Sequence, residues 1–482
     1  MNKTSRLKTL PAGGSLFAVV GALAFVEFVS GIIQGYYTPL LTDIARNFGV
    51  NDADVNWLEG AQLMLSALVV PLFAKLGDRV GHRRMLLISA VLTAAATLAL
   101  AFAPGWWWFM AAWALQGVYV VWLPLEIALV WIRAADHPDS KHTTAKAAGV
   151  LVACLQLGAI AGALAGGALI DSLPLLTVLL VPAAATVLCV IAVLIGVKPR
   201  PRAANPAANT AANPAATGFD SAGMAVIATA LVLFTGALIL LRVSLTNPWA
   251  WSALALSLGF VALFVRIERR HPDPLIDVSM FRNNALWPVF LTAGLFGMSV
   301  LGAQAPLSTF ARTDPAEHGF GLGAPGFKTS LLIGVYVLVM SIGALLYPRL
   351  RAYFGGKRVL AGAALTVALG YGLFVPFHHD YLQVLINMAI VGCGSGMLVA
   401  ALPAAAAAAA PTTQTGVATG LTNSVKTVGG AVASCVFGIA LLSGATGTAG
   451  SISGYYTVWI VCSASAFIAA LLLMFVLPKR AF

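Results

Sequence analysis

Charged residues are scarce in this chain. Asp, Glu, Lys and Arg make up 9% of its 482 residues, whereas 60% of the residues are hydrophobic. A soluble protein carries about 25% charged residues. So few charges leave too little polar surface for a soluble globular protein, and the composition indicates a polytopic membrane protein.

Motifs for catalysis, metal binding and nucleotide hydrolysis are also missing. The sequence has no HExxH pattern, no phosphate-binding Gly-Lys-Ser/Thr and no nucleophile elbow, and its seven histidines fall between the apolar runs. The five cysteines lie within apolar runs and show no CxxC spacing, which favours small membrane-buried residues over disulfides or metal ligands. We therefore expect no enzyme activity, no cofactor, no metal site and no ATP-driven step.

What the sequence does contain is fourteen apolar runs of about 18 residues or more, each long enough to cross a bilayer. Most of the 28 Lys and Arg residues fall between runs on one side of the membrane, and only Arg46, Arg242, Arg312 and Lys328 fall on the other. Basic loops stay in the cytoplasm, so both termini are predicted to be cytoplasmic, and the alanine-rich composition suggests a bacterial inner membrane. The net charge of +11 then reflects topology and contact with anionic lipids, not binding of nucleic acid.

The order of the runs predicts four segments. Residues 198–219 are rich in Pro, Ala and Asn and read as a cytoplasmic linker. Six runs precede it in residues 1–197, two lie in 220–283 and six in 284–482. A degenerate echo of the loop after the second run recurs after the second run of the last block, at Gly355-x-Lys357-Arg358, as expected of transporters built from repeated bundles.

The loop after the second run carries the pattern Gly77-Asp78-Arg79-x-Gly81-x-Arg83-Arg84. It resembles the loop between helices 2 and 3 of the major facilitator superfamily. The loop after the eighth run, Glu268-Arg269-Arg270-x3-Pro274-Leu275-Ile276-Asp277, and the pattern Gly416-x3-Gly420-x2-Asn423-x2-Lys426-x2-Gly429-Gly430 are similar to the fourteen-span drug:proton antiporters of that superfamily.

The resemblance implies an all-α membrane protein with the major facilitator fold and 14 transmembrane helices in a 6+2+6 order. It implies a monomeric, proton-coupled secondary active exporter of small amphipathic molecules such as drugs. The alternatives are a dedicated exporter of one metabolite or lipid and, from another class, a membrane-embedded enzyme or sensor. The loop after the second run would then act in conformational gating through Gly77, Asp78, Arg79, Gly81 and Arg83.

Glycines recur at helical spacing in the fifth run, at Gly158, Gly162, Gly166 and Gly167. Small residues at this spacing let two helices approach closely, which any transporter needs. The same spacing is similar to the antiporter signature of proton-driven exporters, with Ala163 where that signature has proline. Conformational gating and plain helix packing both remain open for these four glycines.

Three carboxylates fall inside predicted spans, at Glu27, Glu59 and Glu126. A charge in hydrocarbon costs at least about 2.5–3.5 kcal/mol, and a carboxylate taken out of water binds a proton more readily. Glu27 lies one turn before Ser30, the position of the aspartate in the antiporter family. Proton coupling by Glu27 and Glu126 is our hypothesis; a structural role remains open for both, and Glu59 sits in the outer interface or contacts substrate.

Further polar residues of the runs are candidates for substrate contact or for bonds between helices. Lys426 is predicted to be buried, either in a structural pair or as an anchor at the level of the lipid phosphates. With Glu27 and Glu59, the candidate substrate-binding residues are Gln34, Tyr36, Gln62, Gln116, Tyr119, Gln156, Gln304 and Asn423.

Overall fold

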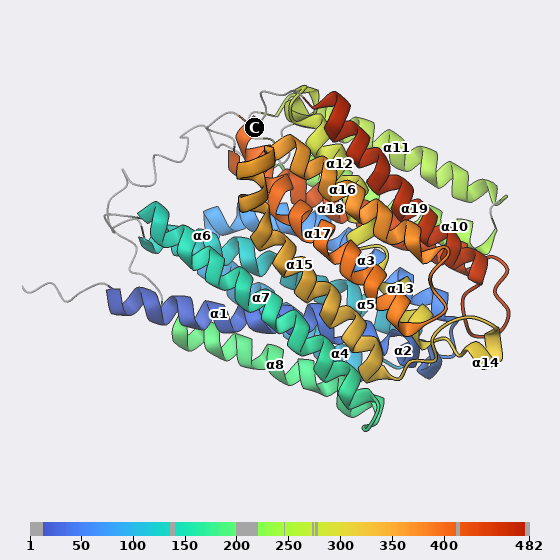
Figure 1. The fold of residues 1–482 in the computed structure, drawn as a ribbon. Helices are drawn as coiled ribbons and strands as arrows, with labels where there is room; N and C mark the ends of the chain where they lie inside the picture. Colours follow the sequence, from blue (N-terminus) through green and yellow to red (C-terminus); the bar gives the residue numbers. More distant parts are fainter. Residues whose placement is uncertain are drawn as a thin grey trace, which may run out of the picture.

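The computed structural model describes residues 13–134, 140–198, 220–244, 246–271, 274, 278–410 and 415–477. These residues form helices and connecting loops, without strands. The described residues contain fourteen helical stretches that are long and apolar enough to cross a membrane, as many as the predicted apolar runs. The prediction of fourteen spans in an all-α membrane protein is confirmed. Figure 1 shows the long helices running side by side along one common direction.

We call residues 13–198 the N-half. Its first and fourth spans are each built from more than one helical segment, because short 3-10 turns interrupt them. The segments are α1 (Gly13–Tyr36), η1 (Thr38–Leu40), α2 (Leu41–Asn47), η2 (Asp52–Asp54), α3 (Val55–Val80), α4 (His82–Ala101), α5 (Trp106–Gln116), η3 (Gly117–Val121), α6 (Trp122–Ala134), α7 (Ser140–Ile170) and α8 (Leu175–Gly196).

We call residues 278–477 the C-half, and two helices, α10 (Ser221–Val243) and α11 (Pro248–Glu268), come between the halves in the chain. The C-half segments are η4 (Val278–Arg282), α12 (Trp287–Val300), α13 (Gln304–Arg312), α14 (Pro315–His318), α15 (Gly326–Phe354), α16 (Gly356–Phe374), α17 (Tyr381–Ala409), α18 (Thr415–Leu442), α19 (Ile452–Leu471) and the π-helical turn η5 (Leu472–Val476).

Each half has its own hydrophobic core. One cluster of buried side chains is drawn almost entirely from the N-half, and a second almost entirely from the C-half. The halves meet where α3 packs on α18 and α7 packs on α15. The exact boundaries that the sequence suggested for two bundles and a linker remain a prediction, and residues 199–219 of the linker lie outside the described residues.

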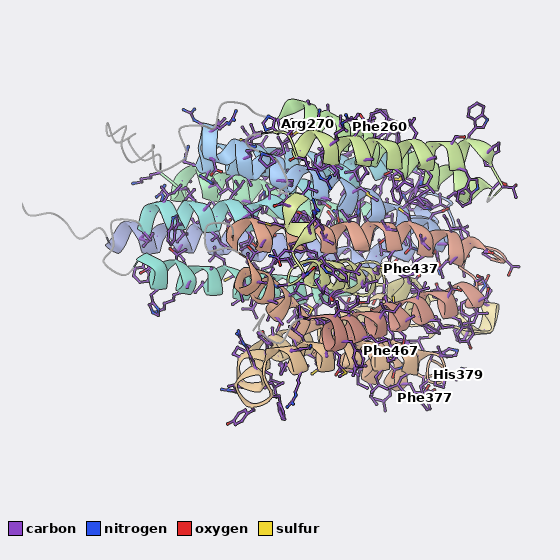
Figure 2. The ribbon with its side chains drawn as sticks, turned by 90° about the horizontal axis from the view of Figure 1, so that it is seen from above. Phe260, Arg270, Phe377, His379, Phe437 and Phe467 are labelled. Atoms are coloured by element: carbon purple, nitrogen blue, oxygen red, sulfur yellow. The ribbon has the colours of Figure 1, made fainter. Side chains whose placement is uncertain are left out.

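The α10–α11 hairpin lies at the edge of the helix array. Leu238, Leu241 and Ala250 of the hairpin pack on Trp57 of α3 and Cys435 of α18. Only 22% and 17% of the residues in the two apolar windows are buried, less than in any other span of the described residues. Figure 2 shows α11, marked by Phe260 and Arg270, at the edge opposite Phe377 and His379. The hairpin is therefore mainly a lipid-facing element.

The two halves are bonded together on one side of the membrane, which we call the closed side. It is the side of α2, α13 and α14, opposite the beginning of α1 (Figure 1). There, Asn51 donates its side-chain amide to the carbonyls of Gly447 and Ala449 at 3.1 and 3.2 Å, and Ser308 donates to the carbonyl of Thr38. The charge pattern predicts that the closed side is external.

The sequence echo corresponds to a repeated turn. Gly81, between α3 and α4, has φ of 107°, and Gly355, between α15 and α16, has φ of 82°; residues with a Cβ rarely adopt such positive values. Two residues later, Arg83 donates to the carbonyl of Val197, and Lys357 donates to the carbonyl of Leu477 at 2.5 Å. Equivalent basic side chains thus bind the end of the last helix in each half.

Candidate functional site

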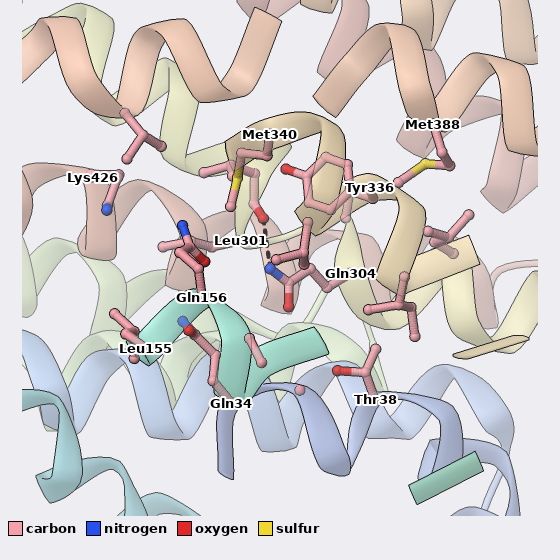
Figure 3. Close-up of a pocket in the computed structure, with 18 of the residues that line it drawn as sticks. Gln34, Thr38, Leu155, Gln156, Leu301, Gln304, Tyr336, Met340, Met388 and Lys426 are labelled. Carbon is pink, nitrogen blue, oxygen red and sulfur yellow. Dashed lines mark hydrogen bonds between the residues drawn. The ribbon is translucent and has the colours of Figure 1, made fainter. Parts of the chain in front are cut away.

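A cavity of about 180 Å³ lies between the halves. The N-half contributes residues of α1, η1 and α7 to its wall, and the C-half contributes residues from α12 to α18. Three of the candidate substrate-binding residues line it, namely Gln34, Gln156 and Gln304 (Figure 3). Gln304 donates to the carbonyl of Val300 at 2.9 Å. The amides of Gln34 and Gln156 have no hydrogen-bond partner within the described protein, so both are free to bind a ligand.

The remaining wall is mostly apolar. Met340 and Met388 bring flexible, polarisable side chains to it. Tyr371 also lines the cavity, and its hydroxyl donates to the carbonyl of Ser299 at 2.6 Å. Such a wall, with a few polar groups on one side, is typical of a site for an amphipathic small molecule.

Glu27 and Glu126 do not line this cavity. They come from α1 and α6, and neither side chain has any exposed surface. Their carboxyl groups lie close enough to interact with each other, and none of the four carboxyl oxygens has a hydrogen-bond partner among the described residues. Two ionised carboxylates in contact and away from water repel strongly, so the pair is stable when it carries at least one proton.

Other ionisable side chains surround this acidic pair. Tyr119 lies near both Glu27 and Glu59, and Cys189 lies near both members of the pair. Glu59 is half-buried on α3. The described residues contain no Lys or Arg that forms a salt bridge with Glu27 or Glu126. Within the described part of the chain, the pair therefore has no fixed counter-ion.

The other candidate residues lie away from the cavity. Tyr36 donates its hydroxyl to the carbonyl of Val178 at 2.7 Å, and Gln116 donates to the hydroxyls of Tyr37 and Thr97 at 3.1 and 3.0 Å. Gln62 lies 3.4 Å from the carbonyl of Trp113. These bonds join helices of the N-half. Asn423 is exposed on α18.

The glycines of α7 bring helices into backbone contact. A Cβ placed on Gly158 would lie 2.0 Å from the carbonyl oxygen of Phe28, and one on Gly166 would lie 2.2 Å from that of Tyr36. Gly162 packs similarly on Ile32, whereas Gly167 faces Gly326 of α15 across the two halves. Gly158, Gly162 and Gly166 thus allow close packing of α7 on α1. Gly167 allows close packing of α7 on α15 of the C-half.

The loop with Gly77, Asp78, Arg79, Gly81 and Arg83 lies on the side opposite the closed side. Asp78 is 75% exposed and accepts from His82 at 3.2 Å. Gly77 is buried against Leu125 and His82. Among the described residues, the Asp78 carboxylate accepts no hydrogen bond from the C-half.

The sequence profile of the Major Facilitator Superfamily matches residues 23–434. The chain belongs to this superfamily.

Several members of the superfamily are similar over most of this chain. The multidrug resistance protein Stp of Mycobacterium tuberculosis (strain CDC 1551 / Oshkosh) is 24% identical over 92% of this chain and 76% of its own length. The cephamycin export protein CmcT of Amycolatopsis lactamdurans is 28% identical over 100% of this chain and 96% of its own length. The probable actinorhodin transporter of Streptomyces coelicolor (strain ATCC BAA-471 / A3(2) / M145) is 25% identical over 88% and 71% of the two chains.

Solved superfamily structures share the fold at low identity. The nucleoside transporter NupG superposes with a TM-score of 0.65 at 14% identity, over 95% of this chain and 98% of that one. The human organic anion transporter MFSD10 gives a TM-score of 0.60 at 15% identity, over 96% and 100% of the two chains. The expected major facilitator fold is confirmed.

Because it belongs to this superfamily, the chain is a membrane transport protein. The sequence predicted only some of the residues that line its cavity. Tyr336, Met340, Tyr371 and Met388 line the cavity but were not among the candidates. Lys426 also lines it, although the sequence suggested a structural or lipid-level role. For Lys426, the available signal was a lysine within an apolar run. Tyrosine and methionine are too common in membrane spans to identify cavity residues.

Proposed function

We propose that this protein is a proton-coupled antiporter that exports small amphipathic molecules. The observation that carries the proposal is the buried contact between Glu27 and Glu126. Glu27 precedes Gln34 of the cavity by two turns of α1, about 10 Å along the helix axis. A proton site and a ligand cavity on one helix can be coupled by movement of that helix.

The proposed cycle uses alternating access between the halves. Substrate enters the cavity from the side opposite the closed side. It leaves when the contacts between the halves on the closed side separate. Protonation of the acidic pair removes its charge repulsion, and loss of a proton restores it, so the pair biases the packing of α1 against α6. Exchange follows if the empty, proton-free transporter does not change conformation.

Export is supported by the relatives, whose names describe drug resistance, antibiotic export and transport. The basic loops support a bacterial inner-membrane location with both termini in the cytoplasm, so that the closed side is external. We further propose two six-helix bundles, residues 1–197 and 284–482, joined by the linker and the lipid-facing hairpin, working as a monomer. The proposed partners of this chain are its small-molecule substrate, protons and the membrane lipids around it.

The test is transport into proteoliposomes that carry an imposed pH gradient. A panel of anionic, neutral and cationic amphipaths is added outside vesicles with an acidic lumen. An antiporter accumulates its substrate inside while protons leave, and a protonophore abolishes the accumulation. Equal final concentrations inside and outside under every gradient would indicate facilitated diffusion, and accumulation in the direction of proton flow would indicate symport; either result overturns the proposal.

A further inference from the structure

The charge of the cavity wall is one-sided. Lys426 of α18 is its single cationic side chain, and no Asp or Glu occurs among the described residues that line it. The neutral polar groups at the wall include the amides of Gln34, Gln156 and Gln304. A ligand in this cavity therefore meets a positive charge and amide groups that can donate hydrogen bonds, but no carboxylate.

Among the described residues, the side chain of Lys426 has no partner. Its ammonium forms neither a hydrogen bond nor a salt bridge with any described residue. Figure 3 shows it on the same side of the cavity as Gln34 and Gln156. An ammonium group that is removed from bulk water and left unpaired is costly, and an ion pair within the cavity offsets that cost.

We infer that the transported molecule carries a carboxylate or a similar acidic group, which pairs with Lys426. The amides of Gln34 and Gln156 donate to the same group, and the apolar body of the molecule lies against Met340 and Met388. This inference rests on the proposed function, since it names the substrate class of the same cavity.

The acidic pair does not provide a site for a cationic substrate. The carboxyl groups of Glu27 and Glu126 contact each other and lie outside the cavity wall. Glu27 lies about two turns of α1 from Gln34, so the proton and the anionic substrate occupy separate sites and are coupled by movement of that helix. In the exchange proposed above, the two are bound in opposite conformations of the transporter.

The test uses three probes with one naphthalene body: 1-naphthylacetate, 1-naphthylacetamide and 2-(1-naphthyl)ethylamine. Their binding to the whole detergent-solubilised protein is measured by calorimetry and by the ligand-induced rise in Tm. We expect the wild type to bind the acetate at least about tenfold more tightly than the neutral amide, and the amine most weakly.

Lys426→Met should remove the preference for the acetate by weakening acetate binding at least about tenfold, and a Tm without ligand at or above that of the wild type shows that the variant is folded. Lys426→Arg should keep the preference, because it keeps the charge. Tightest binding of the amine, a preference for the acetate that survives in Lys426→Met, or binding of none of the three probes would overturn the inference.

Transport separates this inference from the proposed function. If the acetate binds through Lys426 but moves in the direction of proton flow, the antiport proposal fails and the inference stands. If a pH gradient drives exchange of the amine, and Lys426→Met does not alter it, the inference fails and antiport stands.

Discussion

Arg312 of α13 donates two hydrogen bonds to the carboxylate of Asp43 in α2, at 2.6 and 2.8 Å. The guanidinium also lies 3.8 Å from Asp171, at the end of α7. Arg312 is 12% exposed and Asp43 is 24% exposed, so water screens this pair only in part. One arginine of the C-half thus binds two carboxylates of the N-half on the closed side.

Removal of this contact should open the closed side more often. Asp43→Ala deletes both short hydrogen bonds, and a hydrogen bond to a charged group contributes about 1.5–3 kcal/mol. We expect a cysteine placed at Ala449, which is 2% exposed, to react with a polar maleimide about tenfold faster in this variant. The measurement needs a background from which the five native cysteines have been removed.

The matched control is Glu317→Gln. Glu317 is also on the closed side, but it is 72% exposed and contacts only His318 of its own half, at 3.8 Å. Its replacement should leave the labelling rate unchanged. Equal rates in Asp43→Ala and Glu317→Gln would show that the Arg312 contact does not hold the closed side together.

The glycines of α7 that contact α1 should tolerate substitution less well than a glycine of the same helix that contacts nothing. Gly158→Ala forces a methyl group into the backbone of α1 and should lower stability by about 1–3 kcal/mol, seen as a lower Tm in detergent. Gly149→Ala is its control on the same helix, because no atom lies within 4 Å of a Cβ at Gly149. That variant should be as stable as the wild type or slightly more so. Similar losses in both variants would rule out close packing as the cause.

Asp78→Asn should slow transport and leave equilibrium binding of substrate nearly intact. Its side chain is exposed and contacts only His82 among the described partners, so little folding energy depends on it. We expect about a tenfold lower rate in proteoliposomes if the loop governs switching between conformations. A matching loss of binding would instead assign the effect to damage of the substrate cavity.

The orientation of the chain can be read with reporter fusions. Fusions after Ala204 and after Phe482 should report a cytoplasmic position, and a fusion after Leu173, between α7 and α8, should report an external one. A periplasmic signal at Ala204 or Phe482 would invert the orientation and assign the closed side to the cytoplasm.

The spans were predictable because bilayer thickness sets the length of an apolar run, and the two turns at Gly81 and Gly355 were predictable because the motif recurs. The rotation of each helix about its axis was not. The sequence does not indicate that Glu27 faces Glu126, and the lysine within an apolar run signals a polar surrounding for Lys426 without locating the cavity. The Arg312–Asp43 bond escaped prediction for a related reason: charges near span ends are usual, and their partners depend on how two distant halves pack.

The acidic pair is the centre of this account, and proton release on substrate binding tests it most directly. Substrate found in the gradient assay is added to solubilised protein in weakly buffered solution, and the released protons are counted with a pH indicator. The wild type and the control Glu317→Gln should release protons, whereas Glu27→Gln and Glu126→Gln should each bind substrate without release. Release of the wild-type number of protons by either of these two variants would contradict the assignment of the Glu27–Glu126 pair as the coupling site.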